Sequence, residues 1–133
     1  MVSPPNGGPR MKILVILAQK GGSGKSTVTV HLAACAMQLG YQTVMLDVDP
    51  QGTSYNWNER REAASQLSAA KISAVEIPPH LTIAKKEKID LVVIDTSPRS
   101  DSDAATVAHL ADFILIPCRA SIADLETVST TAQ

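Results

Sequence analysis

The chain has 133 residues, of which 44% are hydrophobic and 19% charged, and its formal net charge is −1. This length supports one domain with a real core, and the near-neutral balance excludes the basic composition of a dedicated nucleic-acid-binding protein. No apolar run approaches the roughly 20 residues of a membrane span, and two distant cysteines without metal-ligand spacing indicate free thiols in a reducing cytosol.

The first ten residues hold three prolines and two glycines with almost nothing to bury. This composition predicts a disordered leader over residues 1–10. Met11 lies directly before the first apolar run and is a candidate for the original start of the chain. We therefore expect the folded domain to comprise residues 11–133.

A glycine-rich stretch, residues 19–27, lies between an apolar run at 13–17 and a helix-forming run at 26–39 that Gly40 ends. Strand, glycine-rich turn and helix in this order predict a phosphate-binding loop, because glycines let backbone N–H groups curl around an anion. The helix adds the positive end of its dipole. We expect Lys25 to reach the β- and γ-phosphates and the Ser26 hydroxyl to ligate Mg²⁺.

The loop departs from the general phosphate-binding pattern in two ways. Gln19 takes the place of the first glycine, and Lys20 adds a second lysine inside the loop. Two lysines beside one Mg²⁺-bound triphosphate are more positive charge than the phosphates obviously require. The surplus charge suggests a role elsewhere, such as across a subunit boundary.

Further strands and helices alternate along the rest of the chain, which predicts an α/β fold with a mainly parallel sheet. Apolar residues on both faces of the strands favour a buried sheet. Pro78 and Pro79 are expected to end one strand, and the 85–88 lysine run is interpreted as a solvated face rather than a nucleic-acid contact. The expected strands are 43–46, 72–77, 91–94 and 113–116, and the expected helices are 54–70, 80–88, 101–110 and one from about Ser121.

Three carboxylates follow predicted strands, namely Asp47, Asp49 and Asp95. Ligands of parallel sheets bind outside the carboxyl ends of the strands, so all three can converge on one Mg²⁺-triphosphate. Asp95, after four apolar residues, matches a Walker B position that holds Mg²⁺. We expect Asp49 to orient the attacking water and Asp47 to support the metal shell, with turn and cap carboxylates before Pro50 as the alternative.

Together these residues resemble the ParA-type partitioning ATPases, within the group that includes MinD and the nitrogenase iron protein. Residues 20–27 match the deviant Walker A motif, residues 47–52 match the Asp-x-Asp-Pro-Gln-Gly segment, and Asp95 matches Walker B. The resemblance implies that the nucleotide is bound by Lys20, Gly21, Gly22, Ser23, Gly24, Lys25, Ser26 and Thr27. Ser54, Trp57 and the 95–98 and 115–119 stretches further resemble small members without an N-terminal DNA-binding domain.

The resemblance implies a P-loop three-layer sandwich that forms a homodimer around ATP and Mg²⁺. It implies that Lys20 reaches the phosphates of the partner subunit, and that Lys20, Lys25 and Asp49 serve catalysis. It also implies nonspecific DNA binding, a ParB-like partner that stimulates hydrolysis, and a bacterial cytoplasmic, nucleoid-associated protein. Because such proteins typically continue past this length, we expect an incomplete C-terminal part, where the adenine pocket and much of the DNA-contacting surface would lie.

Other functions remain open at this point. A MinD-like membrane-associated positioning ATPase would show an amphipathic C-terminal helix, and a metabolic P-loop kinase would need an acceptor pocket in place of Lys20. A nucleotide-binding module without turnover is a further alternative. The roles of Trp57, Arg99 and Arg119 stay open between packing or solvated positions and functional ones, whereas Cys118 and the histidines are expected to be structural, the latter being His31, His80 and His109.

Overall fold

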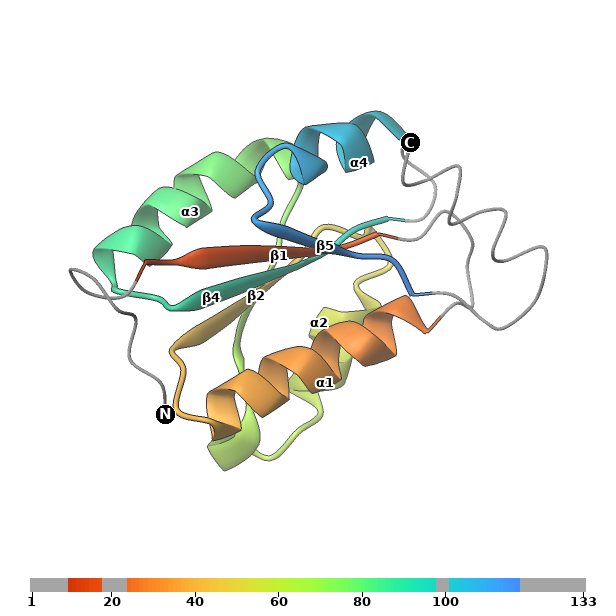
Figure 1. Ribbon diagram of the computed structural model, residues 1–133. Helices are drawn as coiled ribbons and strands as arrows, with labels where there is room; N and C mark the ends of the chain where they lie inside the picture. Colours follow the sequence, from red (N-terminus) through yellow and green to blue (C-terminus); the bar gives the residue numbers. More distant parts are fainter. Residues whose placement is uncertain (1–9, 18–23, 98–100, 118–133) are drawn as a thin grey trace.

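Five parallel strands form the centre of the molecule, and helices cover both faces of the sheet (Figure 1). The computed structural model describes residues 10–17, 24–97 and 101–117. The strands are β1 (Lys12–Ile16), β2 (Thr43–Asp47), β3 (Ser68–Lys71), β4 (Leu91–Asp95) and β5 (Phe113–Leu115). Their order is β3-β2-β4-β1-β5, and every neighbouring pair is parallel. The predicted α/β fold with a parallel sheet is confirmed.

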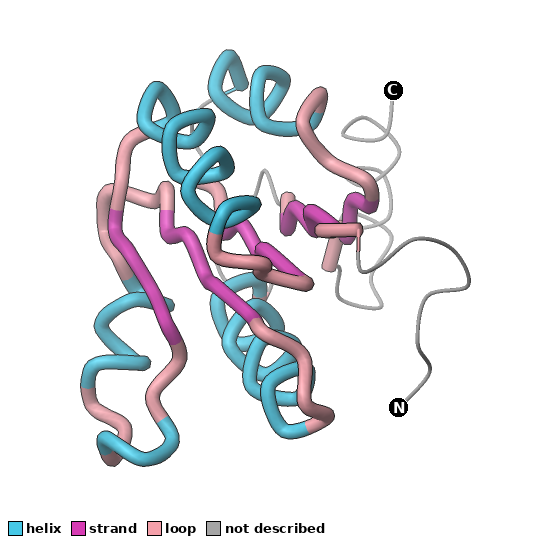
Figure 2. The backbone as a smooth tube through the Cα atoms, turned by 90° about the vertical axis from the view of Figure 1, so that its left-hand side faces the viewer, coloured by secondary structure: helices cyan, strands magenta, loops and turns pink. Residues whose placement is uncertain are grey.

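The helices form two layers, which Figure 2 shows on either side of the strands. They are α1 (Lys25–Gln38), α2 (Thr53–Glu59), α3 (Ile77–Lys86) and α4 (Asp101–Ala108), with short 3₁₀ turns η1 (Ala63–Ser65) and η2 (Ala74–Glu76). Helices α1 and α2 contact one face of the sheet, and α3 and α4 lie over the other (Figure 1). Among the described residues, no helix is long and apolar enough to cross a bilayer.

Alternation along the strands divides the core between these two layers, because successive side chains of a strand point to opposite faces. On the α3 face, Ile13 and Val15 of β1 pack in one cluster with Ile77 of α3. On the α1 face, Ile16 of β1 packs with Val30 and Ala33 of α1. Val92, Val93 and Ile94 of β4 are all fully buried, as expected for the central strand of a sheet covered on both sides.

The predicted elements between residues 54 and 88 need correction. The helix predicted over 54–70 ends at Glu59, and the strand predicted over 72–77 is wrong, because β3 forms earlier, at Ser68–Lys71. The Asn58 side-chain N–H donates a hydrogen bond of 2.9 Å to the Leu67 carbonyl, and its amide oxygen accepts one of 2.8 Å from the Leu67 N–H. This pair of bonds closes the intervening loop. β3 then pairs with Val44–Asp47 of β2, and tertiary pairing outweighs the helix propensity of the alanine-rich sequence.

Pro78 and Pro79 begin a helix rather than end a strand. They lie in the first turn of α3, where the missing N–H groups of proline have no helical partner to lose. α3 therefore starts three residues before the predicted boundary. The other described elements lie within about two residues of their predicted bounds, and the leader before Arg10 and the helix predicted from Ser121 lie outside the described residues.

Candidate nucleotide-binding site

The start of α1 and the carboxyl ends of β1, β2 and β4 meet at one edge of the sheet, which we call the carboxyl edge. Gly24 precedes α1 with φ of 84°, a left-handed conformation that glycine adopts readily. A Cβ atom built on Gly24 would meet no atom of the described residues within 4 Å, so the space in front of the helix is open. An open helix start of this kind favours anions.

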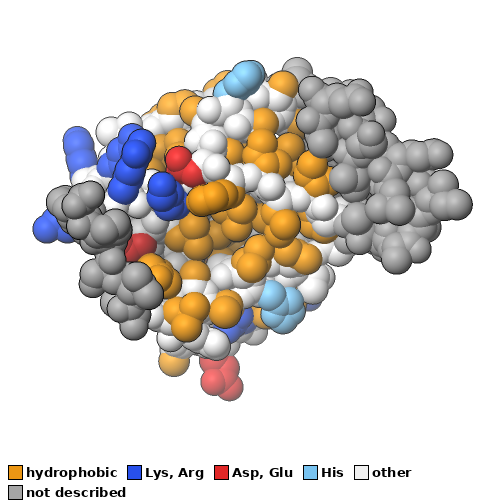
Figure 3. Space-filling model, in the orientation of Figure 1, with side chains coloured by type: hydrophobic (Ala, Val, Ile, Leu, Met, Phe, Trp, Pro, Cys, Tyr) orange, Lys and Arg blue, Asp and Glu red, His pale blue; other side chains and the backbone are white. Residues whose placement is uncertain are grey.

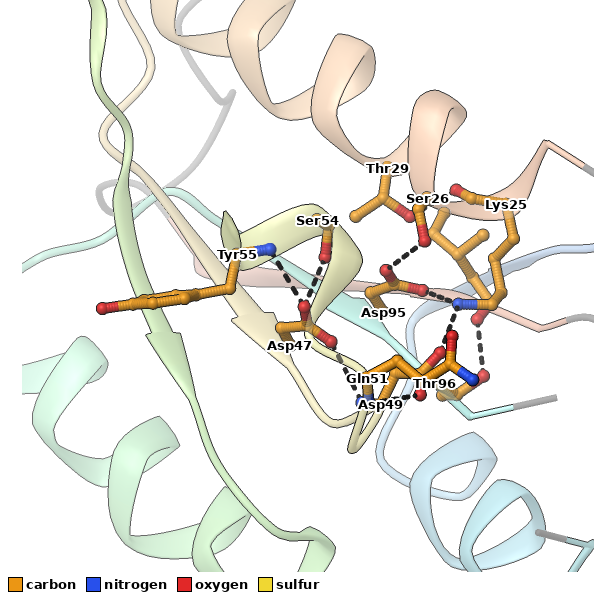
Figure 4. Close-up of polar contacts among 11 residues, drawn as sticks. Lys25, Ser26, Thr29, Asp47, Asp49, Gln51, Ser54, Tyr55, Asp95 and Thr96 are labelled. Carbon is orange, nitrogen blue, oxygen red and sulfur yellow. Dashed lines mark hydrogen bonds and ion pairs between the residues drawn. The ribbon is translucent and has the colours of Figure 1, made fainter. Parts of the chain in front are cut away.

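Lys25, Ser26 and Asp95 come together at this edge (Figure 4). The Lys25 ammonium forms an ion pair with Asp95 Oδ1, and the Ser26 hydroxyl donates a hydrogen bond of 3.2 Å to Asp95 Oδ2. Asp95 is fully buried and Lys25 is 6% exposed. A buried charge without a partner strongly destabilises the folded state, so Lys25 and Asp95 each depend on the other to remain buried and charged.

Asp49 joins the same cluster from the turn after β2. Its Oδ2 lies 3.9 Å from the Lys25 ammonium, while its Oδ1 accepts a hydrogen bond of 3.0 Å from the Gln51 backbone N–H. The side chain is therefore oriented by its own turn, which Gly52 closes with an N–H donated to the Asp49 carbonyl at 2.8 Å. One carboxylate oxygen is fixed, and the other faces the lysine.

Asp47 is also buried at the carboxyl edge, but its contacts are different. Its Oδ2 accepts hydrogen bonds of 2.9 Å from the Ser54 hydroxyl and the Tyr55 N–H, and its Oδ1 accepts one of 3.0 Å from the Asp49 N–H. Gly52, the residue before α2, has no side chain that could accept a hydrogen bond from the first N–H groups of that helix, and Asp47 accepts one of them, the Tyr55 N–H, from the strand. This is the cap role that the sequence left open as the alternative for Asp47 and Asp49, and the sequence did not indicate which of the two aspartates would take it.

Burial raises the pKa of the Asp47 carboxyl above its ordinary value, and repulsion from Asp95 adds to this. The hydrogen bonds from Tyr55, Ser54 and Asp49 oppose the shift. The repulsion follows from the sheet register, in which Asp47 and Asp95 are directly opposed on β2 and β4. The two carboxylates thus influence each other although they bind different partners.

A small cavity of about 60 Å³ lies beside Ser26, between α1 and α2. Trp57 lines it together with Thr27 and His31, and the Trp57 ring is 39% exposed. The His31 and Trp57 rings are 6.1 Å apart, and the Arg61 guanidinium lies 5.1 Å from the centre of the indole. The contact between the His31 and Trp57 rings is consistent with the structural role expected for His31. Trp57 is partly exposed and contacts both His31 and Arg61.

Several predicted site residues lie outside the described part of the chain. These are Lys20, Gly21, Gly22 and Ser23 of the loop, together with Arg99, Cys118 and Arg119. Among the described residues, no group of three or more His, Cys, Asp or Glu side chains is arranged so that it could hold a metal ion. A metal at this edge would therefore rely on Ser26, one carboxylate and non-protein ligands, which is the usual arrangement for Mg²⁺ bound to a phosphate ester.

Comparison with known proteins identifies related sequences. Residues 14–131 match the family model described as the CobQ/CobB/MinD/ParA nucleotide binding domain. The chain is 35% identical to maintenance of carboxysome distribution protein A of Gloeobacter kilaueensis, over 99% of this chain and 59% of that protein. It is 32% identical to sporulation initiation inhibitor protein Soj of Bacillus subtilis, over 80% of this chain and 39% of that protein. The chain thus spans less than two thirds of these relatives.

Solved structures share the fold. A plasmid partition protein from Borrelia burgdorferi bound to AMPPNP superposes with a TM-score of 0.72 at 18% identity, covering 92% of this chain and 67% of that one. The pNOB8 ParA bound to nonspecific DNA superposes with a TM-score of 0.68 at 16% identity, covering 92% and 59%. At these identities the likeness establishes the fold alone.

Proposed function

The chain belongs to the CobQ/CobB/MinD/ParA nucleotide-binding family, and from that premise we propose that it is a ParA-type ATPase that dimerises on Mg²⁺-ATP and positions DNA or other cargo. The observation that carries the proposal is the buried cluster of Lys25, Asp49 and Asp95 at the start of α1. A buried lysine facing two carboxylates beside an open helix start is suited to a triphosphate and its metal.

The residues present fit Mg²⁺. Ser26 and Asp95 offer oxygen ligands already within hydrogen-bond distance of each other, and Mg²⁺ takes only one or two protein ligands beside phosphates and waters. When bound, Mg²⁺ neutralises charge on the β- and γ-phosphates. Asp47 supports this shell indirectly in our proposal, because its three hydrogen bonds fix the chain that leads to Asp49.

Two charged groups act on the reacting phosphate in this scheme. Lys25, held at the carboxyl edge by Asp95 and Asp49, turns its ammonium to the β- and γ-phosphates. Asp49 orients the attacking water, because Gln51 fixes one of its oxygens while the other is directed into the site. The N–H groups of residues 20–27 cradle the phosphates, and Lys20 reaches the phosphates bound by the partner subunit.

The wider assignment follows the relatives. We propose that a ParB-like protein stimulates hydrolysis, that the dimer binds DNA without sequence preference, and that the protein works in the bacterial cytoplasm on the nucleoid. Support comes from the partition and Soj proteins among the relatives and from the DNA named for the pNOB8 protein. The use of ATP rather than GTP is part of the same proposal.

The test measures binding and turnover separately in the 133-residue chain. Lys25→Ala should lose Mg²⁺-ATP binding by isothermal titration, whereas Lys86→Ala, an exposed lysine far from the site, should bind as the parent does. Asp49→Ala should bind Mg²⁺-ATP but hydrolyse it about 10²- to 10⁴-fold more slowly. Unchanged affinity in Lys25→Ala would refute the loop assignment, and parental hydrolysis in Asp49→Ala would refute the role of that aspartate.

Lys20 needs a readout of its own. Lys20→Ala should bind nucleotide nearly as well as the parent but fail to dimerise with a nonhydrolysable ATP analogue, measured by light scattering after size-exclusion chromatography. Normal dimerisation of this variant would remove the cross-subunit role and leave the rest of the site assignment intact.

A further inference from the structure

Lys71, the last residue of β3, lies beside the nucleotide site but has no role in the scheme proposed for it. All strands of a parallel sheet end on the same side, so Lys71 is at the same end of the sheet as the carboxyl edge. Most of the Lys and Arg side chains visible in Figure 3 gather at the opposite end, over the end of α3 and the beginning of β1. Among the described lysines, only Lys25 and Lys71 lie at the nucleotide end.

The Lys71 side chain lies across Gly52, the residue before α2. A Cβ atom built on Gly52 would be 3.0 Å from Lys71 Cδ and Cε and 3.1 Å from Nζ, and these are its nearest atoms outside residues 51–53. Gly52 is buried, whereas Gln51 and Thr53 on either side of it are exposed. Lysine commonly lays its methylene chain on the protein surface and keeps its ammonium in water. The methylene chain of Lys71 therefore covers Gly52.

Gly52 ends the turn that orients Asp49. The Gly52 N–H donates to the Asp49 carbonyl at 2.8 Å, and the Gln51 N–H donates to Asp49 Oδ1 at 3.0 Å. The φ of Gly52 is 64°, in the left-handed region that glycine adopts readily. Glycine also adopts many other conformations at little cost, so a turn that ends in glycine is held firmly only when something packs on it. Lys71 supplies that contact.

The backbone determines where Lys71 lies. Lys71 is opposite Asp47 in the register of β2 and β3, and the N–H of the next residue, Ile72, donates a hydrogen bond of 3.0 Å to the Asp47 carbonyl. Asp47 in turn accepts a hydrogen bond of 3.0 Å from the Asp49 N–H. The turn is thus held at both ends, by Asp47 where it begins and by the Lys71 methylene chain where it closes.

Local stability does not account for a lysine at this position. Its ammonium lies close to the first turn of α2, where a positive charge is unfavourable because it meets the positive end of the helix dipole. The ion pairs of the described residues all involve Lys25, so Lys71 has no carboxylate partner among them. What lysine offers here is a long, unbranched chain that reaches from β3 to Gly52.

We propose that Lys71 is a positioning residue for ATP hydrolysis. Its methylene chain holds Gly52 in the left-handed conformation and thereby keeps one oxygen of Asp49 directed into the site. The inference rests on the proposed function, in which Asp49 orients the attacking water. Misplacing a catalytic group by about 1 Å can cost about 10²-fold in rate, so loosening this turn should slow turnover without weakening nucleotide binding.

The first test compares two substitutions in the 133-residue chain. Lys71→Ala removes the methylene chain and should lower kcat about 10-fold or more, with the KM for Mg²⁺-ATP within about twofold of the parent value. Lys71→Met keeps a long unbranched chain without the charge and should turn over as the parent does. Because Lys71 acts through Asp49, Asp49→Ala/Lys71→Ala should be no slower than Asp49→Ala. The matched control is Lys12→Ala, an exposed lysine at the other end of the sheet, which should change neither constant.

The second test needs no ATP. Amide hydrogen exchange of the nucleotide-free chain, followed by NMR, reports how firmly the turn is closed. The Gly52 N–H should exchange about 5-fold or more faster in Lys71→Ala than in the parent or in Lys71→Met, because its bond to the Asp49 carbonyl opens more often. The buried amides of β4 should exchange as in the parent, which also shows that the variant remains folded.

The outcomes separate this inference from the proposed function. Slower turnover and faster Gly52 exchange in Lys71→Ala, both restored in Lys71→Met, support the positioning role. Unchanged Gly52 exchange overturns it, and so does a Lys71→Met variant as slow as Lys71→Ala, which would assign the effect to the charge. If Asp49→Ala is slow but Lys71→Ala turns over as the parent does, the inference fails and the proposed function stands. Parental turnover in Asp49→Ala refutes the proposed role of that aspartate and overturns the positioning role with it.

Discussion

The two ends of the sheet hold their charges in opposite ways. At the carboxyl edge the charges are buried, with exposed fractions of 6% for Lys25, 8% for Asp49 and 0% for Asp95. At the opposite end, where the strands begin, Lys12, Lys85 and Lys86 are exposed and form no ion pair with a carboxylate of the described residues. A buried charge depends on its neighbours for stability, whereas an exposed charge is stabilised by water. Substitutions should therefore be coupled at one end and independent at the other.

The largest effect is expected from Asp95→Ala, which leaves Lys25 buried without its closest partner. Breaking a buried ion pair typically costs about 3–5 kcal/mol in the free energy of unfolding. The change should appear as a lower midpoint in urea denaturation, with a similar slope. Lys86→Ala, at an exposed position in the last turn of α3, is the matched control and should stay within about 0.5 kcal/mol of the parent.

The coupling itself is measured by the double variant Lys25→Ala/Asp95→Ala. Because the second substitution removes the charge that the first left unpaired, the double variant should lose less stability than the two single variants added together. Strict additivity would mean that the two charges do not depend on each other, and the contrast between the edges would then fail.

The next effect concerns Asp47, and its size depends on pH. Asp47→Asn keeps an acceptor for Ser54 and Tyr55 but turns an amide donor toward the Asp49 N–H, at a cost of about 1–3 kcal/mol. The native pKa of Asp47 lies above its ordinary value of 3.8, chiefly through burial. The native state then binds a proton more tightly than the unfolded state does, and this contribution to stability is lost as pH rises through the native pKa.

The difference in unfolding free energy between parent and Asp47→Asn should therefore widen as pH falls through the raised pKa, and stop widening below about 3.8. Urea titrations at several pH values measure it. The reference variant is Lys86→Gln, at an exposed position that has no contact with Asp47 among the described residues. A gap that narrows on acidification would show that hydrogen bonds, not burial, dominate at Asp47.

Much of this carboxyl edge could be predicted because chain order determines it. In a parallel sheet, residues that follow apolar strands lie at the same end of the sheet, and so the sequence alone predicts Asp49 and Asp95 near the start of α1. What each oxygen binds could not be predicted. Asp47 and Asp49 are two positions apart, yet one is bound to the start of α2 and the other faces Lys25.

The segment from residue 54 to 79 was predicted less well because its structure depends on distant contacts. Local propensity favoured one long helix, but the Asn58 bridge to Leu67 and the pairing of β3 with β2 give a short helix and an early strand. The position of Lys12 beside the 85–88 lysine run was missed for the same reason. The sequence displayed a short lysine run, and only the fold adds Lys12 to it.

A smaller effect is expected where the backbone, not the charge, is special. Gly24→Ala leaves the added methyl group free of contacts, so its cost comes from φ of 84° alone and should be about 1–2 kcal/mol in unfolding free energy. Because this residue also starts the helix that binds phosphate, Mg²⁺-ATP affinity should fall along with the melting temperature. A lower melting temperature with unchanged Mg²⁺-ATP affinity would show that the conformation of Gly24 has no part in nucleotide binding.

Lys88→Gly makes the reverse exchange at the other end of the sheet and should have the smallest effect, with the opposite sign. Relief of the strained φ of 59° is partly offset by the extra chain entropy of glycine, which leaves a gain of about 0.5–1 kcal/mol in unfolding free energy. Lys88→Asn is the control, since asparagine also tolerates this conformation and lacks the charge. If urea denaturation shows neither variant to be more stable than the parent, the left-handed conformation of Lys88 carries no strain that a substitution can relieve.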